Sequence, residues 1–255
     1  MFCVFYSGSV SAAPGNGVVS GVFIPRADLP GVAAGEFAAG ESTITKEGKA
    51  VYGLVNAIYS GLSALTTVTG MTISKGNPSG TGINRFTEAV TLVFQWLADF
   101  STRNLDPIPL NNASTGKVSL ADVFPTATIL MAEEEIPGEG LLIPDTVAAT
   151  YGGDVPGNLS ADARDWIYAL FLAMVAESTL RTATAQSAIT TRSNLLTLRV
   201  AGLSIPANYY GAIPVAGLSE AQLPHVRVFT DTLTLEYELE TNPETQTVEI
   251  RVATS

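Results

Sequence analysis

Two carboxylates draw attention because each interrupts an apolar face. Residues 85–96 read RFTEAVTLVFQW and residues 228–239 read VFTDTLTLEYEL, and both segments alternate between two kinds of side chain. Glu88 and Asp231 fall in phase with the apolar residues of their segments. If a twofold relation brought them together, the two carboxylates could act as a general acid and a general base. The alternative is that each lies near a strand end, where the apolar face reaches solvent.

The remaining candidates for acid–base or metal chemistry are few. His225 is the single histidine and lies six residues before Asp231, so it could serve as a general base, although a histidine beside Pro224 is also typical of an exposed loop. The single cysteine, Cys3, excludes an internal disulfide and a cysteine-based zinc site. The acidic run at residues 133–135 lacks the spacing of an EF-hand loop. We therefore expect neither a metal nor a cofactor.

Candidates for nucleophilic or binding chemistry are limited to one pair of tyrosines. The sequence contains no Gly-x-Ser-x-Gly nucleophile motif, and the glycine-rich residues 76–82 do not have the order of a phosphate-binding loop. Tyr209 and Tyr210 lie in a long segment, residues 202–222, where they could contact a ligand. Trp96 is in phase with the apolar face of residues 85–96, which favours a packing role.

Composition limits the partners. The chain has 255 residues, of which 46% are hydrophobic, so it can bury a large core. It carries 13 basic and 24 acidic residues, and the formal net charge of -11 disfavours binding to nucleic acid. The longest apolar run, residues 166–176, is too short to cross a bilayer and predicts a buried helix.

Short segments of the first half recur in the second half in the same order. Residues 23–25 match residues 142–144, residues 52–54 match 168–170, residues 71–73 match 196–198, and residues 86–92 match 229–235. Each match alone is weak, but their shared order indicates a tandem duplication. The alternative is that two α+β halves merely use similar strand patterns.

Each repeat reads as hairpin, helix, hairpin. In the first, turn residues join strands at residues 2–10 and 18–24, and a helix with Thr45 as N-cap carries an apolar stripe. The second helix is expected to start near Ser160 and to be covered on most sides. Residues 101–112 are polar and broken by prolines, so no strand is expected there.

The predicted fold is therefore α+β, a tandem duplication of a hairpin-helix-hairpin unit with antiparallel sheets packed on a buried helix in each half. Residues 1–100 form the first repeat, residues 101–123 the connection and residues 124–255 the second repeat.

Three classes of function fit this sequence. The first is a non-enzymatic structural or assembly protein, a subunit of a large particle such as a phage virion (a capsid or tail component), whose partners are further copies or other structural subunits. The second is an enzyme that resembles double hotdog proteins and acts on acyl thioesters, with His225 and a carboxylate as acid and base. The third is a ligand- or glycan-binding module that uses residues 202–222. We favour the first, because the candidate residues of the other two have simpler structural explanations.

Overall fold

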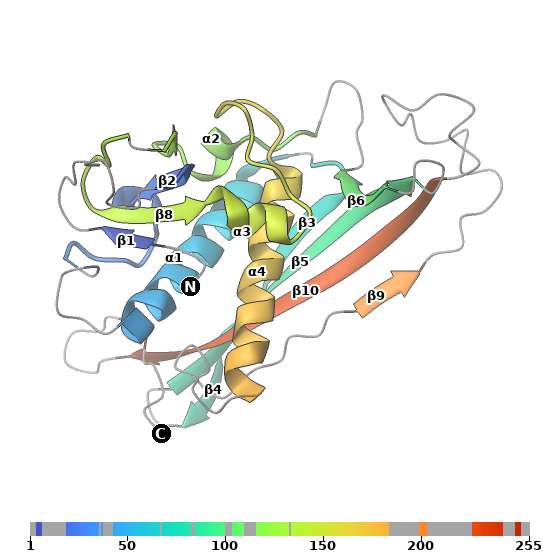
Figure 1. Ribbon diagram of the computed structural model, residues 1–255. Coiled ribbons are helices and arrows are strands. Elements are labelled where there is room, and N and C mark those ends of the chain that lie inside the picture. Colours follow the sequence, from blue (N-terminus) through green and yellow to red (C-terminus); the bar gives the residue numbers. More distant parts are fainter. Residues whose placement is uncertain are drawn as a thin grey trace.

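The computed structural model has an α+β architecture in which two antiparallel sheets pack against helices (Figure 1). It describes residues 4–6, 19–35, 37, 43–66, 68–82, 85–99, 104–109, 116–132, 134–183, 199–202, 226–241 and 248–250. The predicted α+β class is confirmed. His225, Tyr209 and Tyr210 lie outside the described residues.

Two long helices supply much of the core. Helix α1 (Thr43–Ala64) begins two residues before the predicted N-cap, and α4 (Arg164–Ala183) begins after the predicted start near Ser160. The predicted stripe of α1 is buried, and it consists of Val51, Leu54, Val55, Ile58 and Leu62. Helix α4 is covered on most sides between Trp166 and Met174, as its apolar sequence predicted. Apolar periodicity thus located the helix faces better than the helix ends.

The larger sheet is built on two long strands. Strand β5 (Arg85–Asp99) and strand β10 (Val226–Thr241) run antiparallel through fifteen residue pairs. The other edge of β5 pairs with β3 (Met71–Lys75), β4 (Ser79–Gly82) and β6 (Asn104–Pro109). The other edge of β10 pairs with β9 (Arg199–Gly202) and β11 (Val248–Ile250). The final hairpin predicted in each repeat is present, as β3 paired with β5 and as β9 paired with β10.

The alternation of the two long segments is confirmed by burial. Leu92 lies opposite Leu233 and Val90 opposite Leu235, and these four side chains are buried. On the other face Thr91 lies opposite Thr234, and their hydroxyls are hydrogen-bonded at 2.9 Å. The period of two residues therefore gives β5 and β10 one face in the core and one half-buried face.

Strand β6 corrects the interpretation of residues 101–112. It pairs with β5, with Ile108 opposite Leu97 and Pro109 opposite Trp96. Proline lacks the N–H that a central strand needs, so it is tolerated where a strand has a free edge. Among the described strands β6 pairs only with β5, which explains how a proline-containing strand is accommodated.

The smaller sheet has the order β1-β8-β2-β7, formed by β1 (Val4–Tyr6), β8 (Gly140–Pro144), β2 (Gly21–Pro25) and β7 (Thr128–Leu130). Strand β1 pairs with β8 and β7 pairs with β2, so the predicted hairpins β1–β2 and β7–β8 are wrong. The reason is that β2 and β8 pair with each other at the centre of the sheet. Each outer strand therefore joins the inner strand that lies far from it in sequence.

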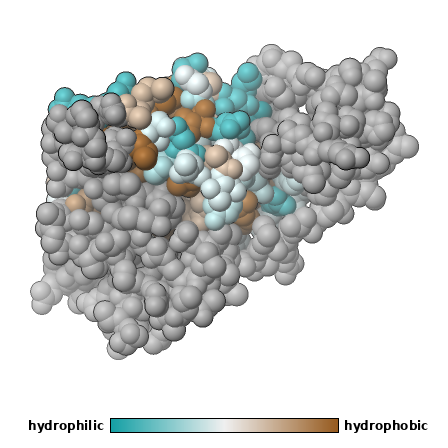
Figure 2. Space-filling view, viewed as in Figure 1, coloured by the Kyte–Doolittle hydropathy of each residue, from teal (hydrophilic) through white to brown (hydrophobic). Residues whose placement is uncertain are grey.

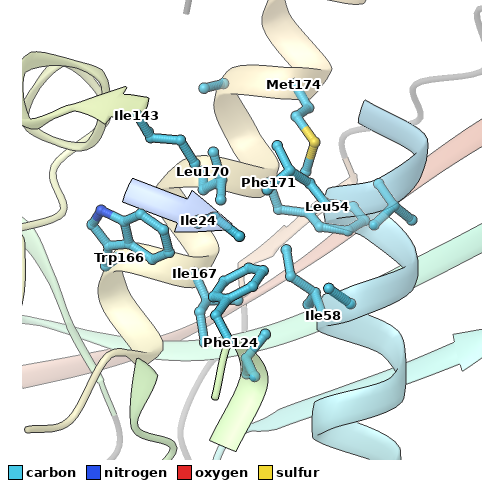
Figure 3. Packing of buried hydrophobic residues seen from close by; sticks show 14 of the residues in the cluster. Ile24, Leu54, Ile58, Phe124, Ile143, Trp166, Ile167, Leu170, Phe171 and Met174 are labelled. Atoms are coloured by element: carbon cyan, nitrogen blue, oxygen red, sulfur yellow. The ribbon is translucent and has the colours of Figure 1, made fainter. Parts of the chain in front are cut away.

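The helices lie between the two sheets. Ile24 of β2 and Ile143 of β8 point among the side chains of α1 and α4, close to Trp166, Leu170 and Ile58 (Figure 3). Buried residues on β5 and β10 belong to the same cluster. Each fully buried large apolar side chain contributes about 1.5–3 kcal/mol to stability. The two halves of the chain therefore share one continuous core.

Two glycines permit the close pairing of β2 and β8. Gly21 lies opposite Pro144, and Gly140 lies opposite Pro25. A Cβ at Gly21 would lie 2.2 Å from the carbonyl oxygen of Ile143, and a Cβ at Gly140 would lie 2.4 Å from the carbonyl oxygen of Ile24. Any side chain at either position would push the two central strands apart.

Replacing either glycine by alanine should destabilise the fold. Gly21→Ala and Gly140→Ala are each expected to lower the free energy of unfolding by about 1–3 kcal/mol, because the new methyl group overpacks a backbone contact. Chemical denaturation of the full chain measures this. Gly157→Ala is the control, since a Cβ there meets nothing within 4 Å. Equal losses in all three variants would contradict the close contact between β2 and β8.

Candidate functional site

The Asp231 cluster, defined as Asp231, Trp96, Tyr168 and Phe94, joins β10, β5 and α4. Asp231 is 3% exposed, and its Oδ2 accepts hydrogen bonds from Trp96 Nε1 at 2.7 Å and from the Tyr168 hydroxyl at 2.5 Å. Its Oδ1 has no hydrogen-bond partner among the described residues. Two donors on one oxygen compensate part of the free energy of burying a carboxylate, about 1.5–3 kcal/mol for each bond to a charged group.

Tyr168 is held from two sides. Its ring stacks on Phe94 with centroids 4.4 Å apart and an interplanar angle of 25°, while its hydroxyl donates to Asp231. Burial raises the pKa of the Tyr168 hydroxyl above its ordinary value of about 10, and the hydrogen bond to Asp231 and the negative charge of Asp231 raise it further. Tyr168 therefore stays protonated at neutral pH and acts as a hydrogen-bond donor that fixes α4 on β10.

The Glu88 cluster, defined as Glu88, Lys75, Asn56, Tyr52 and Tyr59, joins β5, β3 and α1. Lys75 Nζ lies 2.9 Å from Glu88 Oε2, donates to Asn56 Oδ1 at 2.8 Å and faces the ring of Tyr59 at 5.6 Å from its centroid. Asn56 in turn donates to the backbone oxygen of Tyr52 at 2.8 Å. The ammonium group thus links the sheet to the helix.

The Glu88 cluster resembles the Asp231 cluster in that each places a tyrosine near a carboxylate. Burial raises the pKa of the Tyr52 hydroxyl, and the negative charge of Glu88 adds to the increase. In both clusters the negative charge of a carboxylate on a long strand raises the pKa of a tyrosine hydroxyl on a helix. The two clusters differ in how the carboxylate is bound. The ammonium group of Lys75 offsets the charge of Glu88, whereas two neutral groups donate hydrogen bonds to Asp231.

The structure does not bring the two carboxylates together. Glu88 lies opposite Tyr237, and Asp231 lies opposite Phe94, six positions farther along β5. At about 3.4 Å per residue this separates the two carboxylates by roughly 20 Å along the strands, too far to share a proton. The suggestion of a catalytic carboxylate pair is therefore wrong. The alternative of solvated carboxylates also fails, because both side chains are buried.

Acidic side chains after β7 take part in a turn and in one ion pair. Glu134 accepts a hydrogen bond from the backbone nitrogen of Met131 at 3.0 Å. Glu139 accepts one from the backbone nitrogen of Gly35 at 2.8 Å and lies 3.5 Å from Arg26. Within the described ranges no group of three or more His, Cys, Asp or Glu residues could hold a metal ion.

Arg164 is a buried residue that sequence reasoning missed. It is 1% exposed, its Nη2 lies 2.7 Å from Asp162 Oδ2, and its Nη1 donates to the carbonyl oxygen of Thr69 at 2.6 Å. Arg164 thus ties the start of α4 to the segment that precedes β3. The only sequence signal was an arginine two residues after an acid at a predicted helix start, a pattern that is common on exposed helices.

Comparisons of the chain with protein-family models, with curated proteins and with solved structures found no match. None of the helices in the described part of the chain is long and apolar enough to cross a membrane.

Removing the Tyr168 hydroxyl should weaken the attachment of α4. Tyr168→Phe is expected to lower the free energy of unfolding by about 1–3 kcal/mol at neutral pH, because Asp231 loses one of its two donors. Chemical denaturation of the full chain measures this loss. Tyr59→Phe is the control, since it keeps the ring that faces Lys75.

The same variant tests the pH dependence. The folded pKa of Tyr168 lies above its unfolded value of about 10, so its contribution to stability is complete below that pH and is lost as pH rises above it. One such group adds at most about 1.4 kcal/mol per pH unit to the slope. Above pH 10 the stability of Tyr168→Phe should fall less steeply than that of the parent chain. Identical slopes would contradict the role given to Tyr168.

Proposed function

We propose that the chain is a tandem duplication whose halves form a pseudo-twofold dimer, and that it serves as a non-enzymatic structural subunit. The first support is the pairing of β5 with β10. Matching residues of the two strands are 143 positions apart, as are Phe86 and Phe229. In the observed register the matching residues Thr91 and Thr234 lie directly opposite each other. A twofold axis through this pair would exchange the two strands.

The smaller sheet supports the same axis. Residues 21–25 read GVFIP and residues 140–144 read GLLIP, and the matching residues Phe23 and Leu142 lie opposite each other. Gly21 meets the carbonyl of Ile143, and Gly140 meets the matching carbonyl of Ile24. The strand order β1-β8-β2-β7 is also unchanged when the strands of the two halves are exchanged.

Strand β6 extends the correspondence to the edge of the larger sheet. Trp96 lies opposite Pro109 of β6, and its matching residue Leu239 lies opposite Ile250 of β11. Strands β6 and β11 are therefore candidates for equivalent elements, and part of the segment interpreted as a connection belongs to the first repeat. On helices α1 and α4 the matching residues are Tyr52 and Tyr168, each beside the carboxylate of its own half.

The observation that carries the functional proposal is the use made of the two buried carboxylates. Asp231 binds Trp96 and Tyr168, and Glu88 binds Lys75, which donates to Asn56 of α1. Both carboxylates therefore help to fasten a helix to the larger sheet. An enzyme that acts on acyl thioesters through Asp231 would need a route for substrate to a carboxylate that is 3% exposed. Buried polar groups that hold the helices on the sheet make the fold rigid. Such a fold suits a subunit of a large particle, such as a capsid or tail component of a phage.

The native mass of the purified full chain tests this proposal. We expect oligomers that grow with protein concentration in analytical ultracentrifugation, and recovery of the chain in large particles when it is isolated from its source. A chain that stays monomeric at all concentrations and never sediments with particles would contradict the structural role.

A further inference from the structure

The β7 corner, defined as β7 with Val19, Met131, Glu134 and Glu135, exposes apolar side chains. Met131 is 64% exposed and Val19 is 44% exposed, and they are the exposed large hydrophobic residues of the described part of the chain. They lie at the same end of one strand pair, because Gly21 of β2 is opposite Leu130 of β7. Two exposed apolar residues at one strand end offer a partner a small apolar contact, and a binding surface needs a second feature beside it.

The backbone of β7 offers a second feature at this corner. Among the described strands β7 pairs only with β2, so it forms one edge of the smaller sheet. An edge strand presents N–H and C=O groups that can pair with a strand from another chain. Thr128 and Ile129 on β7 are half-buried, so the edge is anchored on the core while Met131 projects into solvent.

Acidic side chains flank β7, and the guanidinium of Arg26, which follows β2, is already paired with Glu139. Glu134 and Glu135 are exposed just after β7, and Asp28 accepts a hydrogen bond from the backbone nitrogen of Thr126 just before it. Between Lys117 and Arg164 the sequence contains eight acidic residues and no basic residue. Figure 2 shows hydrophobic side chains next to hydrophilic ones along the upper edge of the described surface.

We propose that the β7 corner binds an extended cationic segment of another protein, which adds to the edge of β7 as a further strand. In this arrangement main-chain hydrogen bonds form along β7, an apolar side chain of the partner covers Met131, and lysine or arginine side chains approach Glu134 and Glu135. The electrostatic part of this attraction steers the partner and fixes its register, and salt screens it.

Charge selects this occupant over a second copy of the chain. The β7 corner of a second copy carries the same exposed carboxylates, Glu134 and Glu135, so two such corners repel each other, while other surfaces stay free for association between copies. The inference rests on the proposed structural function, because it names the kind of partner that such a subunit would bind.

A pair of matched peptides tests the proposal on the full chain. The probe is a fluorescein-labelled ten-residue peptide that alternates valine with lysine, and its control has glutamate in place of lysine. We expect fluorescence anisotropy to show at least about tenfold tighter binding of the lysine peptide at low salt, with the preference reduced by added sodium chloride. Hydrogen exchange should show new protection of the amides of β7.

Variants locate the binding. Met131→Ser should weaken the lysine peptide several-fold, because it removes the exposed apolar contact without adding charge, whereas Thr146→Ser, at an exposed position on α3 (Asp145–Thr150), should leave binding unchanged. Equal binding of the two peptides, protection confined to other strands, or no binding at about 1 mM peptide would overturn the proposal. Protection of β7 that rises with chain concentration alone would also overturn it, in favour of a second copy. Because assembly is measured separately by native mass, failure here leaves the structural role intact.

Discussion

The antiparallel pairing of β5 with β10 determines which residues can enter the core. Fifteen residue pairs leave little freedom of register, and a shift by one residue would place Val90 and Leu92 on the opposite face of the sheet from Leu235 and Leu233. The helices can then pack only on the face that carries these side chains. The other strands of the larger sheet, β3, β4, β6, β9 and β11, all pair with β5 or β10. The register between β5 and β10 therefore sets where they lie relative to one another.

That register also places two carboxylates on the buried face, and the packing of the helices follows from the need to satisfy them. Asp231 requires donors, which Trp96 and Tyr168 supply, and Glu88 requires a cation, which Lys75 supplies. The resulting contacts fix α4 and α1 on the sheet. The smaller sheet then closes the other side of the helices, where the close contacts at Gly21 and Gly140 hold β2 against β8.

Local patterns in the sequence predicted which faces of the long strands and helices are buried. Alternation in residues 85–96 and 228–239 predicted the faces of β5 and β10, and apolar spacing predicted the buried stripe of α1. Pairing between distant segments was not predictable in the same way. Turn residues suggested hairpins, whereas β1 pairs with β8, and the prolines of β6 concealed an edge strand. The partners of Asp231 were also missed, because they come from β5 and α4, far from it in sequence.

A cross-strand disulfide tests the register most directly. In a Cys3→Ser background, Thr91→Cys with Thr234→Cys places two thiols on residues that lie directly opposite each other, where cross-strand Cβ atoms are about 4.5–5.5 Å apart. Thr91→Cys with Thr230→Cys is the matched control, because Thr230 lies four residues along β10. The observed register predicts rapid disulfide formation in the first pair under mild oxidation and almost none in the second, measured by mass spectrometry of the intact chain. Equal formation in both pairs, or faster formation in the control, would contradict it.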